Sequence, residues 1–385
     1  LLDGKPFSFY WGTDPTADSL HLGHYSSLCM AKRLANAGHH PILLCGGATG
    51  RIGDPRPTAE REIMPEERIV GNIDGIRNQI STYVPTAELV DNYDWTKGYE
   101  FLNFLRDIGK YININYMLDK DIIRRRLESG ITFAEFSYML LQGYDFLHLF
   151  ETKNCIMQVA GSDQWGNITT GVELIRKKLD QTAYAFTMPL ILDSTGKKFG
   201  KSEGNALWLN KEKTSPYEIY QYLINTDDGK VEEYLKVFTF LSKEQIEEVM
   251  KNQNEHPETR IAQKTLAWEV VKDLHGDKEA DNAVSVSEKL FKGDFSGLSV
   301  SEIKTGMKSV PSFDLKEPLP LIDVLVNNKI AQSRREAREF LGSNAISVNG
   351  NIETDENKII GKECAIGGEI VIIRRGKKKY YIGNC

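Results

Sequence analysis

The amino-acid sequence predicts an α/β domain built on a parallel sheet, then an all-helical domain, then a small α+β domain. From residue 7 to about residue 199, short apolar runs alternate with helical patterns, as in strands joined by crossover helices. Residues 205–309 show helical periodicity and hardly any strand pattern. A proline-rich stretch then precedes two helical and two strand-like segments. The 385 residues suffice for two or three domains, which we expect at 1–204, 205–310 and 321–385, with 311–320 as a linker.

The first strand and helix lie near the start of the chain. Pro6 to Trp11 is short, aromatic-rich and strand-like. Leu20 to Ala37 carries apolar residues at helical spacing, so a helix is predicted there. Asp18 or Ser19 can cap its start, and the glycine and proline that follow can end it.

Two histidines fall in the predicted first turn of this helix. His21 and His24 are three residues apart, so both side chains lie on one face. The unpaired N–H groups and the positive end of the helix dipole favour an anion there, and imidazoles can donate hydrogen bonds to a phosphate chain. Most pairs of this kind at a helix start are simply two solvated histidines. A metal pair is less favoured, because no third ligand follows at the usual spacing.

Glycine-bounded turns follow two predicted strands. Pro41 to Cys45 runs into the glycine-rich loop Gly46 to Asp54, and Ile156 to Ala160 runs into Gly161 to Asn167. The carboxyl end of a parallel strand is where open α/β sheets bind ligands. The first loop matches neither the Walker A nor the dinucleotide pattern, but its glycines would let the backbone and Asp54 approach a ligand closely.

A long helix is predicted from Phe133 to Phe150. Tyr138, Gln142 and Asp145 fall at i, i+4 and i+7, so they project from one face. Such a polar stripe is usually the solvent side of a helix. If it faces a pocket instead, it suits a small zwitterion with a polar tip.

A lysine-bearing loop and most of the helices come later in the chain. Lys198 and Lys201 flank a glycine in a loop opened by Asp193, and they can close over a triphosphate from the side opposite the histidines. Alone, such a loop is usually solvated surface. Further helices are predicted at residues 97–108, 168–179, 217–224, 230–240, 243–251, 260–275, 277–291, 301–308 and 321–328, with another starting at Gln332 or Ser333, and strands at 345–348 and 369–373.

Composition is that of a globular protein, with 41% apolar and 26% charged residues. No apolar run approaches the roughly 18 residues that span a bilayer, and the start shows no secretory signal. The chain begins at Leu1 without an initiator methionine, so residues preceding it are expected to be missing. The five cysteines are odd in number, scattered and without a Cys-x-x-Cys pair, which favours reduced thiols in a cytoplasmic setting over disulfides or zinc.

Basic charge is concentrated near the carboxyl end. The chain has a net charge of −6, yet residues 314–385 hold 12 basic and 10 acidic side chains. Arg374 to Lys379 holds five positive charges in six residues, a local footprint suited to a polyanion, although a solvated tail is the simpler meaning. Arg334, Arg335 and Arg338 lie on adjacent surface of a predicted helix.

Five stretches together resemble class I aminoacyl-tRNA synthetases, and specifically the bacterial-type tyrosyl-tRNA synthetases. The resemblance covers nearly the whole chain. It implies a Rossmann-like catalytic domain, an all-helical anticodon-side domain, and a small α+β RNA-binding domain like that named after ribosomal protein S4. The stretches are Asp14 to His24, Gly46 to Pro55, Glu135 to Phe146, Gly161 to Asn167 and Lys198 to Ser202.

The resemblance implies a tyrosine–tRNA ligase. L-tyrosine would react with ATP to give tyrosyl-adenylate and pyrophosphate, and the tyrosyl group would pass to the 3′ end of tRNA(Tyr). Neither step needs a protein nucleophile, because positioning and charge stabilisation can carry the catalysis. Mg2+ would accompany ATP without protein ligands, no zinc or organic cofactor is expected, and the family resemblance suggests a homodimer with no membrane association.

Site residues are carried over from the resemblance position by position. The catalytic set is Thr16, His21, His24, Lys198 and Lys201. The tyrosine-binding set is Tyr10, Asp54, Tyr138, Gln142, Asp145 and Gln164. The ATP-binding set is Asp14, His21, Gly23, His24, Ser27, Gly161, Asp163, Lys198, Lys201 and Ser202. The RNA-binding set is Arg334, Arg335, Arg338, Arg374, Arg375, Lys377, Lys378 and Lys379.

The sequence departs from the family pattern at several places. Trp11, Thr13 and Ser27 replace the usual residues, and Trp11 puts a ribose contact in doubt. After Asp54, the usual lysine-containing loop is replaced by a segment in which Arg56 and Arg61 are possible phosphate contacts.

Three other functions are compatible with parts of the sequence. A tryptophanyl-tRNA synthetase shares both signatures, but it lacks the C-terminal RNA module and has no reason to pair Tyr10 with Asp145. A small-molecule nucleotidyltransferase would not explain the RNA module. An RNA-binding or splicing helper derived from a synthetase would be favoured by loss of the signature lysines or histidines, and both sets are present.

Overall fold

The computed structural model describes residues 2, 4–55, 64–202, 205–308, 310–376 and 379–385. It divides into two compact units. We call residues 1–214 and 226–266 the N-terminal unit, and residues 215–225 and 267–385 the C-terminal unit.

The N-terminal unit is built on a five-stranded parallel sheet with the strand order β3-β2-β1-β4-β5. This confirms the predicted fold class. β1 lies in the centre, where the strand order reverses, and such a switch point is where doubly wound sheets bind ligands. The strands are β1 (Ser8–Thr13), β2 (His40–Cys45), β3 (Glu88–Asp91), β4 (Cys155–Gly161) and β5 (Tyr184–Met188).

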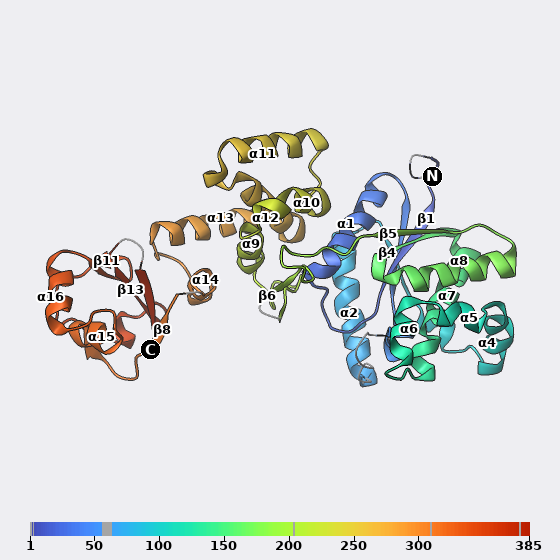
Figure 1. Cartoon of the computed structure of the whole chain (residues 1–385), viewed down its shortest axis with the longest axis horizontal. Helices are drawn as coiled ribbons and strands as arrows, with labels where there is room; N and C mark the ends of the chain where they lie inside the picture. The colour runs from blue at the N-terminus through green and yellow to red at the C-terminus, as the bar shows by residue number, and fades with distance from the viewer. Residues whose placement is uncertain (1, 3, 56–63, 203–204, 309, 377–378) are drawn as a thin grey trace. The chain divides into compact units, whose positions relative to one another are not determined.

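Helices cover the sheet on both faces (Figure 1). Tyr10, Phe146 and Leu174 belong to one apolar cluster, so α7 and α8 pack on the face to which Tyr10 points. Successive side chains alternate along a strand, which turns Trp11 toward the opposite face. The principal helices are α1 (Leu22–Asn36), α2 (Glu66–Tyr83), α7 (Phe133–Lys153) and α8 (Trp165–Leu179).

Helix α1 begins later than predicted, because His21 and not Asp18 or Ser19 is its N-cap. The His21 backbone is extended, with φ −123° and ψ 169°, and it forms a β-bridge with Trp208. This long-range pairing keeps the chain extended up to the cap. The prediction that His21 lies inside the first helical turn is therefore wrong.

The helix predicted at 97–108 is present but starts later than expected. The segment contains α4 (Phe101–Asp107), and the short α3 (Tyr93–Thr96) precedes the predicted range. The connection to α7 contains α5 (Ile114–Leu118) and α6 (Asp121–Leu127). After β5, β6 (Lys201–Ser202) pairs with β7 (Asn205–Ala206) in an antiparallel hairpin.

The region after Ala206 is helical, as predicted. Within the N-terminal unit lie α10 (Asp228–Phe238) and α11 (Lys243–Glu255). The C-terminal unit contains α9 (Pro216–Ile224), α13 (Asp277–Lys292) and α14 (Val300–Gly306). Residues of α12 (Ile261–His275) fall in both units. The three-domain division stays a prediction.

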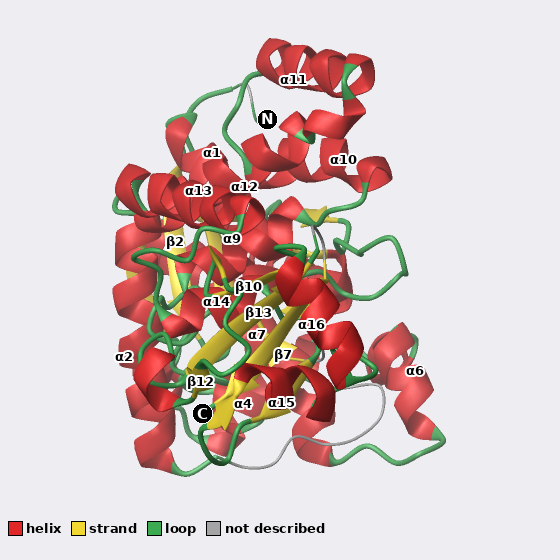
Figure 2. Ribbon diagram, turned by 90° about the vertical axis from the view of Figure 1, so that its left-hand side faces the viewer, coloured by secondary structure: helices red, strands yellow, loops and turns green. Residues whose placement is uncertain are grey.

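A second five-stranded sheet, in the order β11-β10-β13-β14-β8, ends the C-terminal unit. Figure 2 shows its strands β10 and β13 beside α15 and α16. A buried apolar cluster that includes Leu325, Leu341 and Ile373 joins these helices to the sheet. The elements are α15 (Leu321–Asn327), α16 (Arg334–Gly342), β8 (Ser312–Asp314), β10 (Ile346–Val348), β11 (Asn351–Ile352), β13 (Ile370–Arg375) and β14 (Lys379–Asn384).

Two expectations for this region are corrected. The segment 311–320 contains β8, which pairs with β14, and β9 (Leu319–Pro320), which pairs with β12 (Ile359–Ile360). Prolines are tolerated here because these are edge or two-stranded pairings. The resemblance also implied a strand from Arg374 to Lys379 that extends the RNA-binding surface. Instead, β13 ends at Arg375 and β14 begins at Lys379.

None of the five cysteines, all of which the structure describes, forms a disulfide. Cys29, Cys45 and Cys155 are buried, and Cys364 and Cys385 are partly exposed. Among the helices in the described residues, none is both long and apolar enough to cross a membrane.

Candidate active site

Two adjoining cavities lie at the carboxyl ends of the N-terminal sheet. The larger has a volume of about 330 Å³ and the smaller about 50 Å³. Asp14, Tyr138 and Gln164 line both. Every residue predicted to bind tyrosine or ATP whose side chain is described lines at least one of them. Lys201 and Ser202 are predicted site residues whose backbone forms β6, and their side chains lie outside the described part of the chain.

The small cavity contains buried polar atoms without partners. Tyr10 is 1% exposed, packs against the Phe146 ring at 5.4 Å, and its hydroxyl has no hydrogen-bond partner among the described residues. The same holds for the side-chain oxygens of Gln142 and Gln158, which line the same cavity. A buried polar group left unpaired costs about 1–3 kcal/mol. The cavity is therefore suited to a ligand that supplies polar groups to these atoms.

Asp145 supplies a buried carboxyl at this cavity. It is 2% exposed and accepts hydrogen bonds from Asn92 Nδ2 and Trp95 Nε1, both at 2.9 Å. Burial raises the pKa of the Asp145 carboxyl to about 7, against the opposing effect of these two hydrogen bonds. The two donors hold the carboxyl in one orientation.

Sequence reasoning missed three residues of the small site. Asn92 and Trp95 follow β3, and their signal was their place just beyond the carboxyl end of a strand. Gln158 lies in β4, and its signal was a polar residue within an otherwise apolar strand. Each comes from a different chain segment than Asp145, so only the fold brings them together.

Asp14 lies where the two cavities meet. Its carboxylate accepts hydrogen bonds from Tyr138 Oη at 3.0 Å and from Thr49 Oγ1 at 2.7 Å. A Cβ at Gly46 would lie 2.3 Å from Asp14 Oδ1. The glycine-rich loop therefore lets the chain pass next to this carboxylate.

Asp54 lines the larger cavity within an amide network. It accepts hydrogen bonds from Gln164 Nε2 and Asn167 Nδ2, both at 3.0 Å. Asn167 also donates to Gln164 Oε1 at 3.1 Å. The glycine-bounded turn after β4 thus fixes Asp54, and Asn167 is a further residue that the site prediction omitted.

The two histidines form a reciprocal cap at the start of α1. The Gly23 N–H donates to His21 Nδ1 at 3.1 Å, and the His21 N–H donates to His24 Nδ1 at 3.2 Å. Their ring centroids are 3.9 Å apart. Because each Nδ1 accepts a hydrogen bond from a backbone N–H, each neutral ring carries its own hydrogen on Nε2. Burial, with a smaller contribution from His21, lowers the pKa of His24 to about 3, so His24 is a neutral donor at physiological pH.

The lysine loop is ordered by Asp193. Its carboxylate accepts hydrogen bonds from Thr195 Oγ1 at 2.7 Å and from the N–H groups of Thr195 and Lys197 at 2.9 Å. Lys198 is exposed and lines the larger cavity. The loop then meets α1, since a Cβ at Gly200, whose φ is +86°, would lie 2.5 Å from the Gly23 nitrogen.

The residues that depart from the family pattern lie at the larger cavity. Trp11 is buried and lines it, and Thr13 lines both cavities. The Ser27 hydroxyl donates to the His24 carbonyl at 2.8 Å. Arg56 and Arg61 lie outside the described residues.

Three of the predicted RNA-binding arginines already contact other groups of the C-terminal unit. Arg334 pairs with Asp323, and Arg338 pairs with Glu356 at 2.6 Å. Exposed pairs of this kind contribute about 0–1 kcal/mol, so a phosphate could replace the carboxylate. Arg375 donates to the Ile330 carbonyl and lies over the Phe340 ring of α16. Arg335 lies in α16, Arg374 in β13 and Lys379 in β14. Lys377 and Lys378 fall outside the described residues.

Family models match most of the chain. The model described as tRNA synthetases class I (W and Y) matches residues 2–292, and that of the tyrosine–tRNA ligase SYY-like C-terminal domain matches residues 302–382.

Curated relatives match over nearly their whole length. The chain is 47% identical over 386 residues to tyrosine–tRNA ligase of Streptococcus agalactiae, covering 98% of this chain and 92% of the relative. It is 48% identical over 393 residues to that of Bacillus pumilus, covering 99% and 93%.

Solved structures agree with this match. A C-terminally truncated mitochondrial tyrosyl-tRNA synthetase of Aspergillus nidulans is 34% identical with a TM-score of 0.69, covering 74% of this chain and 86% of that one. A tryptophanyl-tRNA synthetase of Encephalitozoon cuniculi bound to tryptophan is 14% identical with a TM-score of 0.53, over 78% and 82%, which shows a shared fold.

Proposed function

Because the chain belongs to the class I tRNA synthetase family of the tyrosyl and tryptophanyl enzymes, we propose that its two adjoining cavities bind tyrosine and ATP. Its activity is that of a tyrosine–tRNA ligase, and ATP is its substrate. The observation that carries the site assignment is the small cavity with its unpaired buried polar atoms.

Tyrosine occupies the small cavity with its phenol between Tyr10 and Asp145. The unpaired Tyr10 hydroxyl and the oriented Asp145 carboxyl support this placement. Phenylalanine would bond to neither group, and a site built around a substrate hydroxyl rejects the analogue lacking it by about 10⁴–10⁵-fold. At the other end of the ligand, Asp54, Tyr138 and Gln142 hold the ammonium, and Gln164 lies near the carboxylate.

ATP occupies the larger cavity. Thr16, His21 and His24 donate to its phosphates, and the neutral Nε2–H of each ring supports this role. Asp163 and the backbone of Gly161 contact the ribose. Asp14, Gly23, Ser27 and Ser202 complete the nucleotide site. Mg2+ accompanies the nucleotide, held by phosphate oxygens and water, which is usual for Mg2+.

Activation is an in-line displacement at phosphorus. The tyrosine carboxylate attacks the α-phosphorus, a phosphorus–oxygen bond forms, and the bond to the leaving pyrophosphate breaks. His21 and His24 stabilise charge developing on the phosphates, and Lys198 and Lys201 neutralise the pyrophosphate. A ribose hydroxyl at the tRNA 3′ end then attacks the tyrosyl carbonyl and releases AMP. Fixed donors that match developing charge need not reorganise during the reaction.

The C-terminal sheet and α16 bind tRNA(Tyr) through the arginines and lysines of the predicted RNA-binding set. The match to the C-terminal domain of tyrosine–tRNA ligases supports this. The exposed ion pairs of Arg334 and Arg338 support it too, because each can exchange its carboxylate for a phosphate. We also propose a cytoplasmic location, which the five cysteines, all present as thiols, support.

The protein forms a homodimer through exposed apolar side chains of α4 and the start of α7. Leu102 is 76% exposed and Phe133 is 71% exposed, and Phe101, also in α4, is exposed as well. Large apolar side chains that are exposed on a protein surface are candidates for such an interface. Sedimentation equilibrium at micromolar concentration should give twice the chain mass for the native protein and one chain mass for Leu102→Asp. A native mass of one chain would refute the dimer.

The test of the proposed function is ATP–pyrophosphate exchange with each of the twenty amino acids, without tRNA. Exchange with tyrosine alone is expected. Exchange with tryptophan would keep the chemistry and overturn the assignment of the small cavity. No exchange by folded protein supplied with Mg2+ would refute the ligase, and an RNA-binding helper would then be the better account.

A further inference from the structure

We propose that one face of α2 positions the loop that leads to the two histidines, and so controls ATP turnover but not tyrosine binding. The proposal rests on the proposed function, in which this loop contributes Asp14 and Thr16 to the nucleotide site. Asn72, Gly75 and Gln79 form the contact face, which we call the α2 clamp. Their spacing of i, i+3 and i+7 puts all three on one side of the helix.

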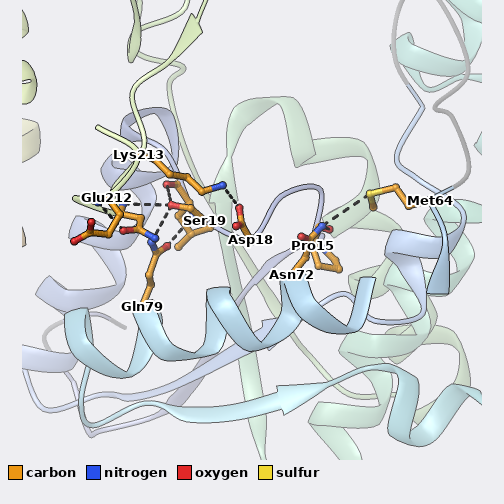
Figure 3. Close-up of polar contacts among 10 residues, drawn as sticks. Pro15, Asp18, Ser19, Met64, Asn72, Gln79, Glu212 and Lys213 are labelled. Carbon is orange, nitrogen blue, oxygen red and sulfur yellow. Dashed lines mark hydrogen bonds and ion pairs between the residues drawn. The ribbon is translucent and has the colours of Figure 1, made fainter. Parts of the chain in front are cut away.

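Asn72 and Gln79 bond to the loop backbone or to a side chain fixed to it (Figure 3). Asn72, which is buried, donates through Nδ2 to the Pro15 carbonyl at 2.8 Å. Gln79 Oε1 accepts from the Leu20 N–H at 2.8 Å, and its Nε2 donates to Ser19 Oγ at 2.8 Å. The clamp thus satisfies polar groups at both ends of the loop, which no helix or strand of the loop itself could satisfy.

Gly75 brings α2 against the middle of the loop. A Cβ at this position would lie 2.1 Å from the Asp18 carbonyl oxygen. Since real Cβ atoms do not approach an oxygen so closely, any side chain here must move either the loop or the helix. The other glycine in the same helix, Gly71, is exposed, and no described residue lies within 4 Å of its added Cβ.

The clamp also joins the histidine loop to the segment that follows the lysine motif. Ser19, which is 3% exposed, accepts from Gln79 and from the Asn210 N–H at 3.3 Å. The Leu209 N–H donates to the Leu20 carbonyl at 2.8 Å, and Lys213 pairs with Asp18. Gln79 therefore contacts the point where the chain before the histidines meets the chain after the lysines.

Asp14 of this loop also lines the small cavity, but the end of that cavity proposed to hold the phenol is built from other elements. Tyr10 lies in β1 and Asp145 in α7, and the clamp residues do not line that cavity. A displaced loop should therefore misplace the phosphate-binding groups and leave the phenol site intact. Clamp residues touch no reacting atom, so they are positioning residues.

The two glycines provide a matched test. Gly71→Ala and Gly75→Ala make the same change in the same helix, and alanine favours the helix at both positions. Gly75→Ala should lower kcat/KM for ATP in tyrosine-dependent exchange by about 10- to 100-fold, since a displacement near 1 Å can cost about 100-fold. The Kd for tyrosine should stay within about twofold, because the clamp lies outside the small cavity. Gly71→Ala should match the native protein in both.

Gln79 provides a second, independent test. Gln79→Met removes both hydrogen bonds at nearly constant size and should also lower kcat/KM for ATP. Gln79→Glu keeps an acceptor for the Leu20 N–H and should recover part of the loss. Asn78→Met on the exposed side of α2 is the control.

The outcomes separate this proposal from the proposed function. If the native protein exchanges with tyrosine and Gly75→Ala equals Gly71→Ala, the clamp has no positioning role. Parallel losses of tyrosine affinity and ATP turnover in Gly75→Ala and Gln79→Met would also overturn it, because they would indicate general unfolding. If the native protein itself shows no exchange, it is the proposed function that fails.

Discussion

The two cavities differ in how the chain builds them. The small cavity is walled mainly by β1, β4 and α7, and its polar residues Tyr10, Asp145 and Gln158 come from these elements. The larger cavity is walled mainly by a loop, a helix start and the lysine loop, with Lys198 exposed. In the proposed function, recognition of the amino acid therefore depends mainly on strands and a helix, and phosphate chemistry mainly on loop segments. Each of the following substitutions tests this difference between the two cavities.

The largest effect is expected from Asp145→Ala. The change removes the proposed acceptor for the phenol and takes from the Trp95 donor its partner, whereas Asn92 Nδ2 keeps its bond to Thr49. Losing a hydrogen bond to a charged group costs about 1.5–3 kcal/mol, and an unsatisfied buried phenol costs about 1–3 kcal/mol more. A total near ~4 kcal/mol should lower kcat/KM for tyrosine about 1,000-fold in pyrophosphate exchange. Asp94→Ala on exposed α3 should change little. A loss below tenfold for Asp145→Ala would contradict the phenol assignment.

His24→Asn should be the next largest. Removing one fixed donor to developing charge costs about 100- to 1,000-fold in kcat, and the small cavity is untouched. Stopped-flow measurement of adenylate formation should show this loss, with the Kd for tyrosine unchanged. The exposed His40 at the start of β2 is the control. Loss of tyrosine affinity in His24→Asn would erase the distinction between the two cavities.

Tyr10→Phe should have a smaller effect of two kinds. Losing one neutral hydrogen bond of about 0.5–1.5 kcal/mol should lower kcat/KM for tyrosine about 2- to 15-fold. In the free protein, the same change removes a buried hydroxyl that has no partner among the described residues. The free protein should therefore be more stable, by about 1 kcal/mol. A lower Tm without tyrosine would show that the hydroxyl has a partner in the free state.

The smallest effects are changes in stability with pH, and they should have opposite signs in the two cavities. The pKa of Asp145 is raised to about 7, above about 3.9 in an unfolded chain. The folded state therefore binds more protons between these values, and this contribution to stability is complete below pH ~4 and lost as pH rises through 7. The pKa of His24 is lowered to about 3, below about 6.5 unfolded. Its contribution is complete above pH ~6.5 and lost as pH falls toward 3.

Thermal unfolding between pH 4.5 and 7.5 measures the pH-dependent contributions of Asp145 and His24 to stability. Asp145→Asn should make Tm rise more steeply with pH than in the native protein, and His24→Asn should make it rise less steeply. Differences of a few degrees are expected. Curves parallel to that of the native protein would mean that neither group titrates differently on folding.

The sequence predicted what local pattern determines. Alternating apolar runs and helical periodicity indicated the parallel sheet and most helices. The family resemblance identified candidate site residues, and these do line two adjoining cavities. Contacts between distant segments could not be predicted in this way. The extended backbone of His21 depends on pairing with Trp208, and the strand β8 depends on pairing with β14.

The missed site residues have the same explanation. Asn92 and Asn167 carry no catalytic signature of their own, and their importance comes from the carboxylates they meet across the fold. The contact of Gly75 with Asp18 could not be predicted from the local sequence either. A glycine within a helical pattern indicates only a weaker helix at that position.

Labelling reagents for thiols should modify the native protein in one unit only. Cys29, Cys45 and Cys155 are buried in the N-terminal unit, and burial raises the pKa of Cys45 and Cys155 to about 12, so almost no thiolate forms there at neutral pH. Cys364 and Cys385 are partly exposed and both belong to the C-terminal unit. A maleimide fluorophore can therefore be attached next to the proposed RNA-binding sheet without engineering a cysteine, and without disturbing the cavities where tyrosine is activated.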